Sequence, residues 1–213
     1  MAIFSDGFET GNFNNWTGTN GAPSVQGVVV HHGSWAALMD ADNESCYKDL
    51  DAIGEAFFRF YFRYTVNPAI GETYEIADIA QEVWTHLLRV LIVNDDGTIK
   101  WRIEVRKGDA TYQTFTADTP NPTINTWYCV ELWFKKNTVD GAKLYVNSVN
   151  VLTATGITTY DENIACVVLR YFTSAASTPN QYFDCTVVDS SRINCEAEEE
   201  AKILRRLLVG VGL

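Results

Sequence analysis

Apolar and polar residues alternate along most of the chain, and this period of two predicts β-strands rather than helices. The segment FFRFYFRYTV (57–66) is the clearest example. One of its faces is apolar and carries Phe58, Phe60, Phe62 and Tyr64, while the other carries Phe57, Arg59, Tyr61 and Arg63. Successive side chains of a strand point to opposite faces, so the first set is expected to face a core and the second to face outward.

Similar segments follow one another at short spacings, with turn residues between them. Within 86–108, the residues Asn94–Gly97 predict a hairpin turn, because Asp-Gly readily adopts the positive φ angles of a tight turn. Further strands are predicted within 25–40, 111–117, 126–136, 142–152, 165–172 and 181–191. About ten to twelve short strands with intervening turns are typical of an all-β, two-sheet antiparallel sandwich. We therefore expect one such domain over residues 1–193.

The C-terminal segment 194–213 breaks this alternation. Acidic residues open it and basic residues follow, which is the charge order that a helix dipole favours. One apolar stripe at helical spacing is formed by Ala197, Ala201, Leu204 and Leu208. The segment is predicted to form one short amphipathic helix with an apolar tail. Because such a helix is marginally stable alone, we expect it to dock on the sandwich or on a partner, including a second copy of the chain.

Composition and charge narrow the classes of function. Apolar residues make up 46% of the 213 residues and charged residues 20%, which is typical of a folded globular protein. The net charge of −11 disfavours contact with the phosphate backbone of nucleic acids. No apolar stretch reaches the length of about 18 residues typical of a membrane-spanning helix. The opening FSDGFETGNFNNWTG lacks the basic start and apolar run of an export signal. We expect neither a nucleic acid nor a membrane as partner.

The five cysteines are odd in number and widely spaced, which indicates neither a zinc cluster nor a disulfide framework. Cys129 and Cys166 lie within apolar strand patterns, where a thiol usually serves as a small core residue. Buried, reduced thiols are therefore expected. A Cys185–Cys195 or Cys46–Cys185 bridge is the alternative if the protein acts outside a cell.

Several motifs occur in an order that resembles a known family. FSDGFETGNFNNWTG and HHGSWAALMD resemble the opening of many carbohydrate-associated sandwiches. Four later segments resemble the later strands of the same group, namely NDDGTIKWRIEV, NTWYCVELWFKK, AKLYVNSVNV and QYFDCTVVDSS. The chain thus resembles the concanavalin A-like lectin/glucanase superfamily, in its laminin-G-like branch. The resemblance implies a jelly-roll β-sandwich in which the opening segment packs beside the closing strand.

The resemblance also implies a structural Ca²⁺. In many members, acids of the opening segment and of the closing strand share this ion, which prefers several oxygen ligands. Asp6, Glu9 and Asp184 occupy the corresponding positions here. Cys185 stands where a second Asp is common, which weakens the match.

Catalytic carboxylates are a further implication, because the glucanases of the superfamily carry them along one strand. The segment EIADIAQE (75–82) offers Glu75, Asp78 and Glu82. The odd spacing sends Glu75 and Asp78 to opposite faces of a strand unless a bulge intervenes. We expect solvated acids on a loop instead.

The outward faces of the predicted strands suggest a sugar-binding surface. Aromatic rings pack on sugars, and arginine and carboxylate groups hydrogen-bond to hydroxyl groups. The residues expected to share the concave sheet are Arg59, Tyr61, Arg63, Arg102, Glu104, Glu131, Trp133 and Arg170. Cross-strand pairing between these arginines and glutamates is the alternative explanation of the same pattern.

Three functions stay open on these grounds. The favoured one is a non-catalytic carbohydrate-recognition or adhesion-type domain. The second is a structural subunit of a larger assembly, such as a virus particle or an extracellular filament. The third is a glycoside hydrolase or polysaccharide lyase, and it has the least support because His31, His32 and His86 form no recognisable metal or triad motif.

Overall fold

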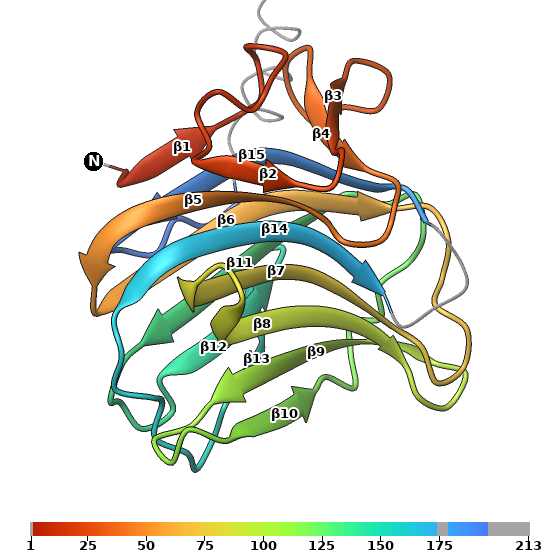
Figure 1. The fold of residues 1–213 in the computed structure, drawn as a ribbon. Coiled ribbons are helices and arrows are strands. Elements are labelled where there is room, and N and C mark those ends of the chain that lie inside the picture. The colour runs from red at the N-terminus through yellow and green to blue at the C-terminus, as the bar shows by residue number, and fades with distance from the viewer. Residues whose placement is uncertain (1, 174–178, 196–213) are drawn as a thin grey trace, which may run out of the picture.

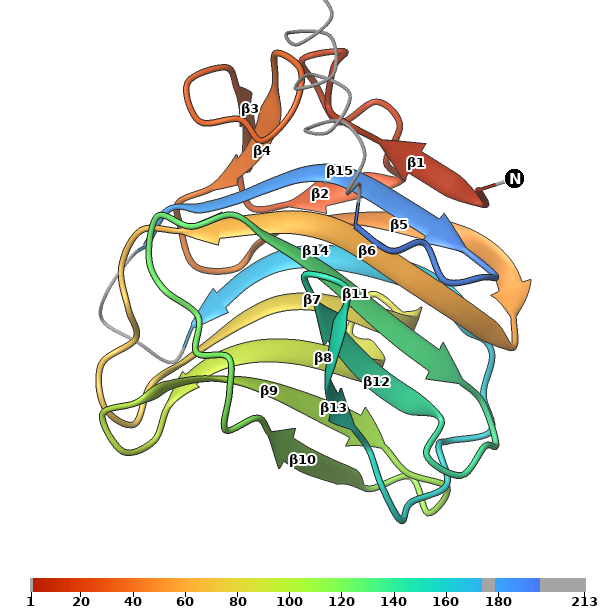
Figure 2. The same ribbon diagram turned by 180° about the vertical axis from the view of Figure 1, so that it is seen from behind.

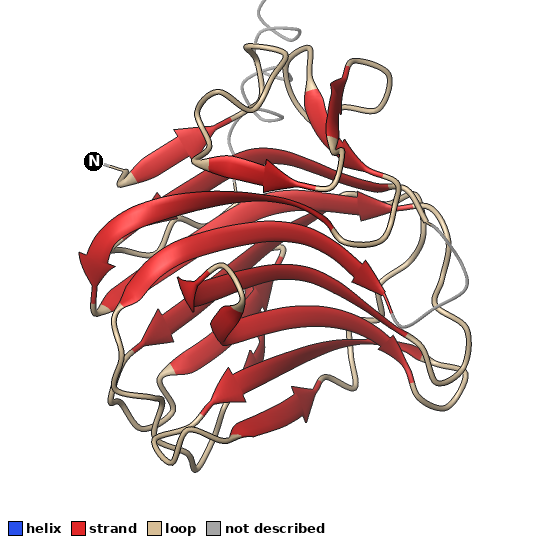
Figure 3. Cartoon of the chain, in the orientation of Figure 1, coloured by secondary structure: helices blue, strands red, loops and turns tan. Residues whose placement is uncertain are grey.

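The computed structural model describes residues 2–173 and 179–195, and within these ranges it contains fifteen β-strands and no helix (Figures 1 and 3). The strands form two antiparallel sheets that lie face to face (Figure 2). The predicted all-β, two-sheet sandwich is confirmed. The helix expected in 194–213 lies outside the described residues, apart from Asn194 and Cys195, which are not helical. The described part therefore holds no helix that is long and apolar enough to cross a membrane.

The eight-stranded sheet has the order β13-β12-β11-β6-β15-β4-β3, and β1 pairs with β15 outside this path. Its strands are β1 (Phe4–Asp6), β3 (Ser24–Gln26), β4 (Ala36–Met39), β6 (Glu55–Tyr64), β11 (Tyr128–Lys135), β12 (Ala142–Val146), β13 (Val149–Thr153) and β15 (Gln181–Asp189). The seven-stranded sheet has the order β10-β9-β8-β7-β14-β5-β2. Its strands are β2 (Gly18–Asn20), β5 (Glu44–Ile53), β7 (Thr73–Glu82), β8 (Thr85–Asn94), β9 (Ile99–Arg106), β10 (Tyr112–Thr116) and β14 (Ile164–Thr173).

The inward faces of the strands build the core between the sheets. On β6, Phe58, Phe60 and Phe62 are fully buried, as the alternation predicts. Trp101 of β9 meets them from the opposite sheet, and its ring centroid lies 6.5 Å from that of Phe62. Burial of a large apolar side chain stabilises the fold by about 1.5–3 kcal/mol, so these residues dominate the contact between the sheets. The polar and charged side chains of the same strands lie on the outer faces of the two sheets.

The N-terminal segment packs beside the closing strand, as expected from the resemblance. β1 pairs with β15, and Phe4 lies opposite Val188. Phe8 is fully buried and stacks on Trp16 with centroids 5.9 Å apart. The indole Nε1 of Trp16 donates a hydrogen bond to Asp6 Oδ2 at 2.8 Å. The aromatic residues of the opening segment therefore anchor it on the body of the sandwich.

The chain after β15 returns to the eight-stranded sheet. The backbone N–H groups of Ile193 and Asn194 donate to Oε2 of Glu131 on β11, at 3.1 and 2.8 Å. Cys195 forms a disulfide with Cys129 of the same strand. The expectation of reduced thiols is wrong for this pair. Alternation along β11 places Cys129 on the outer face beside Glu131, where the returning chain reaches it.

Candidate functional site

The outer face of the seven-stranded sheet gathers charged side chains from four neighbouring strands. Core residues flank Arg89 on β8 and Glu104 on β9, so alternation directs these two side chains outward. The register of β8 and β9 places Arg89 opposite Glu104. β7 lies on the other side of β8, and β14 follows β7, so acids and arginines of all four strands come into reach of one another.

A bulge brings Glu75 and Asp78 of β7 to this same face. The pairing of β7 with β8 shifts between Glu75 and Ala77, so the alternation skips one residue. Arg89 binds both carboxylates, with Nη1 2.7 Å from Glu75 Oε1 and Nε 3.0 Å from Asp78 Oδ1. The expectation of solvated acids on a loop is wrong, because both residues lie within a strand and Asp78 is fully buried. Glu82, at the end of the strand, is exposed.

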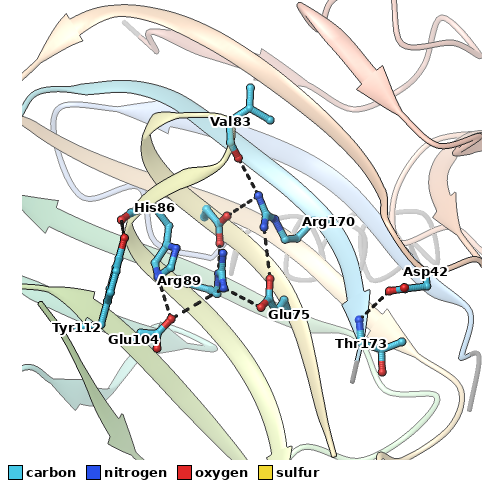
Figure 4. Close-up of polar contacts among 10 residues, drawn as sticks. Asp42, Glu75, Val83, His86, Arg89, Glu104, Tyr112, Arg170 and Thr173 are labelled. Atoms are coloured by element: carbon cyan, nitrogen blue, oxygen red, sulfur yellow. Dashed lines mark hydrogen bonds and ion pairs between the residues drawn. The ribbon is translucent and has the colours of Figure 1, made fainter. Parts of the chain in front are cut away.

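Arg170 of β14 completes a charge cluster that consists of Glu75, Asp78, Arg89 and Arg170. Figure 4 labels Glu75, Arg89 and Arg170 of this cluster. Nη2 of Arg170 lies 2.8 Å from Asp78 Oδ2, and its Nη1 lies 3.3 Å from Glu75 Oε2. Nη2 also donates to the carbonyl oxygen of Val83 at 2.9 Å, so the cluster holds the turn between β7 and β8. Burial raises the pKa of the Glu75 carboxyl, and the nearby Asp78 carboxylate adds to this against the pull of the two arginines.

A histidine–carboxylate pair adjoins the charge cluster. His86 Nε2 and Glu104 Oε2 are 2.8 Å apart, and the same oxygen lies 3.9 Å from Arg89 Nη1. The hydrogen bond with His86 lowers the pKa of Glu104, so this carboxyl is ionised at neutral pH. Tyr112 stacks on the imidazole with ring centroids 4.4 Å apart. Its hydroxyl donates to the His86 carbonyl oxygen at 3.3 Å, which ties β10 into the site.

Exposed aromatic side chains flank these polar groups. Trp84 lies in the turn between β7 and β8 and is 63% exposed, and its ring centroid lies 5.5 Å from the guanidinium carbon of Arg170. Tyr112 and Phe172 are 42% and 41% exposed. Each of these rings adjoins a polar residue of the site: Trp84 adjoins Arg170, Tyr112 adjoins His86, and Phe172 lies opposite Glu75 in the pairing of β14 with β7. This face therefore offers flat apolar surfaces beside fixed hydrogen-bonding groups.

The residues predicted to form one sugar-binding surface are divided between the two sheets. Arg102, Glu104 and Arg170 lie on the seven-stranded sheet. The others lie on the eight-stranded sheet, at Arg59, Tyr61, Arg63, Glu131 and Trp133. The expectation that they share one sheet is wrong, because β6 and β11 pair with each other while β9 and β14 belong to the opposite layer.

On the eight-stranded sheet, these side chains hold loops and the returning chain. Trp133 Nε1 donates to Glu55 Oε1 at 2.9 Å, and Arg63 Nη2 donates to Asn125 Oδ1 at 3.1 Å. Glu131 is buried and binds the backbone of the segment that follows β15. These contacts differ from the cross-strand arginine–glutamate pairs offered as the alternative; a pair of that kind is formed by Arg170 and Glu75 on the seven-stranded sheet.

The acids expected to hold calcium, Asp6, Glu9 and Asp184, each accept N–H hydrogen bonds. The donors are Phe8, Asn15 and Trp16 for Asp6, Ser34 and Trp35 for Glu9, and His31, His32 and Cys185 for Asp184. Arg59 lines the same hollow of about 320 Å³ as Asp6 and Glu9, and its positive charge opposes a cation there. Across residues 2–173 and 179–195, no group of three or more His, Cys, Asp or Glu side chains is arranged to hold a metal ion. The calcium site that the resemblance implies at Asp6, Glu9 and Asp184 therefore stays a prediction.

Sequence reasoning missed five residues of the site, namely Trp84, His86, Arg89, Tyr112 and Phe172. For Arg89 the sequence does contain a signal: the hairpin predicted at Asn94–Gly97 has a register that places Arg89 opposite Glu104. The histidine and the tyrosine leave no such signal, since their contact depends on how β10 folds back beside β9.

Comparisons with known proteins support the fold. No protein-family model matches the chain, and no curated protein matches it significantly. The endo-β-1,4-glucuronan lyase of the fungus Trichoderma reesei is similar over 90% of this chain and 96% of its own, with a TM-score of 0.68 and 15% identity. The cellulose induced protein Cip1 is similar over 90% of this chain and 99% of its own, with a TM-score of 0.64 and 15% identity. The ligand-binding domain of botulinum neurotoxin serotype D, in complex with N-acetylneuraminic acid, is similar over 87% of this chain and 44% of its own, with a TM-score of 0.55 and 12% identity. These neighbours are jelly-roll β-sandwiches, consistent with a concanavalin A-like fold.

Proposed function

We propose that this protein is a glycan-binding domain that holds an oligosaccharide along the outer face of the seven-stranded sheet without cleaving it. The observation that carries the proposal is the position of the exposed Trp84, Tyr112 and Phe172 around the hydrogen-bonding groups of that face. Aromatic rings pack on the C–H faces of sugars, and carboxylate and hydroxyl groups bind sugar hydroxyls. Ion pairs hold the polar groups in place before a ligand arrives, which lowers the entropy cost of binding.

The charge cluster argues against glycoside hydrolysis. Hydrolases of this kind use one protonated and one ionised carboxyl group on either side of the glycosidic bond. Glu75 and Asp78 are instead each bound by two arginines, and Asp78 is fully buried among them. Neither carboxylate is placed to approach a sugar ring.

The structural neighbours support a carbohydrate-related sandwich domain. One is a glucuronan lyase, and another is a toxin domain in complex with N-acetylneuraminic acid. A lectin-like role, membership of the laminin-G-like branch and a single domain over residues 1–193 are parts of the proposal. Self-association through residues 194–213 and a role as structural subunit stay predictions, and a monomer in light scattering at high protein concentration contradicts both.

A glycan array followed by calorimetry tests the proposed site. For a glycan found on the array, Trp84→Ala and Tyr112→Ala are each expected to weaken binding about tenfold, because each removes one stacking surface. Trp133→Ala is the matched control, since it removes an aromatic ring from the opposite sheet. Loss of binding in the control alone moves the site to the eight-stranded sheet. Absence of binding to any glycan at about millimolar concentration contradicts the proposal.

A polysaccharide lyase is the second candidate, and one observation favours it: His86, Glu104 and Tyr112 form a contiguous group. In β-elimination a base removes the proton beside a uronate carboxylate, the C–O bond to the departing sugar breaks, and a C=C bond forms. His86, oriented by Glu104, would act as the base, and Tyr112 would protonate the departing oxygen. The ultraviolet absorbance of an unsaturated uronate product, absent in His86→Ala, tests this candidate. No absorbance change with glucuronan or alginate contradicts it.

A further inference from the structure

We infer that the outer face of the seven-stranded sheet selects glycans that carry no negative charge. The inference rests on the proposed function and adds the substrate class to it. Its basis is the distribution of charge at the site. The two guanidinium groups of the charge cluster are engaged by carboxylates, whereas the more exposed charge beside them is a carboxylate.

The arginines of the cluster are poorly placed to bind an acidic sugar. Arg170 contacts Asp78, Glu75 and the Val83 carbonyl oxygen at once, and its side chain is only 6% exposed. Arg89 binds the same two carboxylates from the other side. If either arginine turned toward a uronate, the fully buried Asp78 would lose a partner, and an uncompensated buried charge is strongly unfavourable.

Glu104 is the charged group of the site that an incoming ligand meets. Its side chain is 27% exposed, about twice as much as that of Arg89 at 13%. His86 holds it in place through a short hydrogen bond. An ionised Glu104 accepts hydrogen bonds from sugar hydroxyls and repels a uronate carboxylate. Since like charges placed together act against the wrong partner, the same group both binds and discriminates.

Cations on the neighbouring positions of β9 are also engaged. Lys100 Nζ lies 3.0 Å from Asp96 Oδ2, and Arg102 pairs with Asp95. Arg106 donates to Gln81 Oε1 at 3.3 Å and lies over the ring of Tyr160, 4.1 Å from its centroid. Because its contacts are with an amide and an aromatic ring, Arg106 is the group that an acidic ligand would have to recruit.

Calorimetry with matched oligosaccharides tests the inference on the full chain. The probes are pairs with the same linkage and length, glucan with glucuronan and mannan with mannuronan oligosaccharides. Whichever pair the protein binds, we expect the neutral oligosaccharide to bind at least about tenfold more tightly than its uronate counterpart. Glu104→Gln is expected to narrow this ratio to about threefold or less. Glu55→Gln is the control, because it makes the same change at a carboxylate of similar exposure, 34%, on the opposite sheet.

A second measurement keeps the test independent of how the variant folds. Raising the ionic strength from about 0.01 to 0.15 M shortens the screening length from about 30 to 8 Å, so uronate binding to the unaltered protein is expected to strengthen relative to neutral binding. Tighter binding of the uronate member, especially if Arg106→Gln abolishes it, overturns the inference while the proposed function stands. A ratio that neither Glu104→Gln nor salt changes overturns it as well. If no member of any pair binds, the proposed function itself fails.

Discussion

Removal of the Cys129–Cys195 disulfide is expected to destabilise the domain mainly through the unfolded chain. The bond joins residues 66 positions apart and encloses β12, β13, β14 and β15, which belong to both sheets. In the chain-entropy model, a closed loop of this length contributes about 4 kcal/mol to the free energy of unfolding, and measured effects are commonly about 2–4 kcal/mol. The hydrogen bonds from Ile193 and Asn194 to Glu131 can form without the bond, so the folded sandwich is expected to persist.

The assay is denaturant and thermal unfolding of the Cys195→Ser variant, followed by tryptophan fluorescence. For a domain of this size, the loss corresponds to a fall in Tm of about 4–16 °C. Cys185→Ser is the matched control, because Cys185 retains its thiol in the structure. Unfolded without reductant, the protein is expected to show three thiols, at Cys46, Cys166 and Cys185. Five titratable thiols would refute the bond, and an unchanged Tm with the bond shown to be lost would refute the entropy argument.

Three further predictions concern single positions. Asp78→Asn is expected to cost about 3–5 kcal/mol, since it leaves two arginines with one carboxylate; a loss below about 1 kcal/mol in urea unfolding would contradict this. Gly141→Ala is expected to cost about 1–3 kcal/mol, because a Cβ there would lie 2.7 Å from the Lys135 carbonyl oxygen. Gly54→Ala, whose Cβ would meet only a lysine side chain at 3.6 Å, is its control in thermal unfolding. Glu104 has a lowered pKa in the folded state, so its stabilisation is present above its unfolded pKa of about 4.3 and is lost as the pH falls through the folded value. The stability gap between the unaltered protein and Glu104→Gln should therefore shrink below about pH 4, and a gap independent of pH would count against the ion pair.

The faces of the regular strands were predictable from the sequence. Phe58 and Phe60 point inward and Arg59 points outward because the burial of apolar side chains sets the face of each residue locally. β7 was not predictable in this way. Its bulge carries Asp78 to the face of Glu75, and this shift depends on pairing with β8 rather than on the segment itself.

The sequence by itself determined the all-β class, the inward and outward sets of each regular strand, and the turn at Asn94–Gly97, because neighbours within a few residues decide these properties. The tertiary structure alone decided which outward faces share a sheet and which residues meet there. Arg170 reaches Glu75 across 95 positions of sequence, and Cys129 reaches Cys195 across 66. No local pattern specifies such pairs, since they arise only when the order of strands in each sheet brings distant segments side by side.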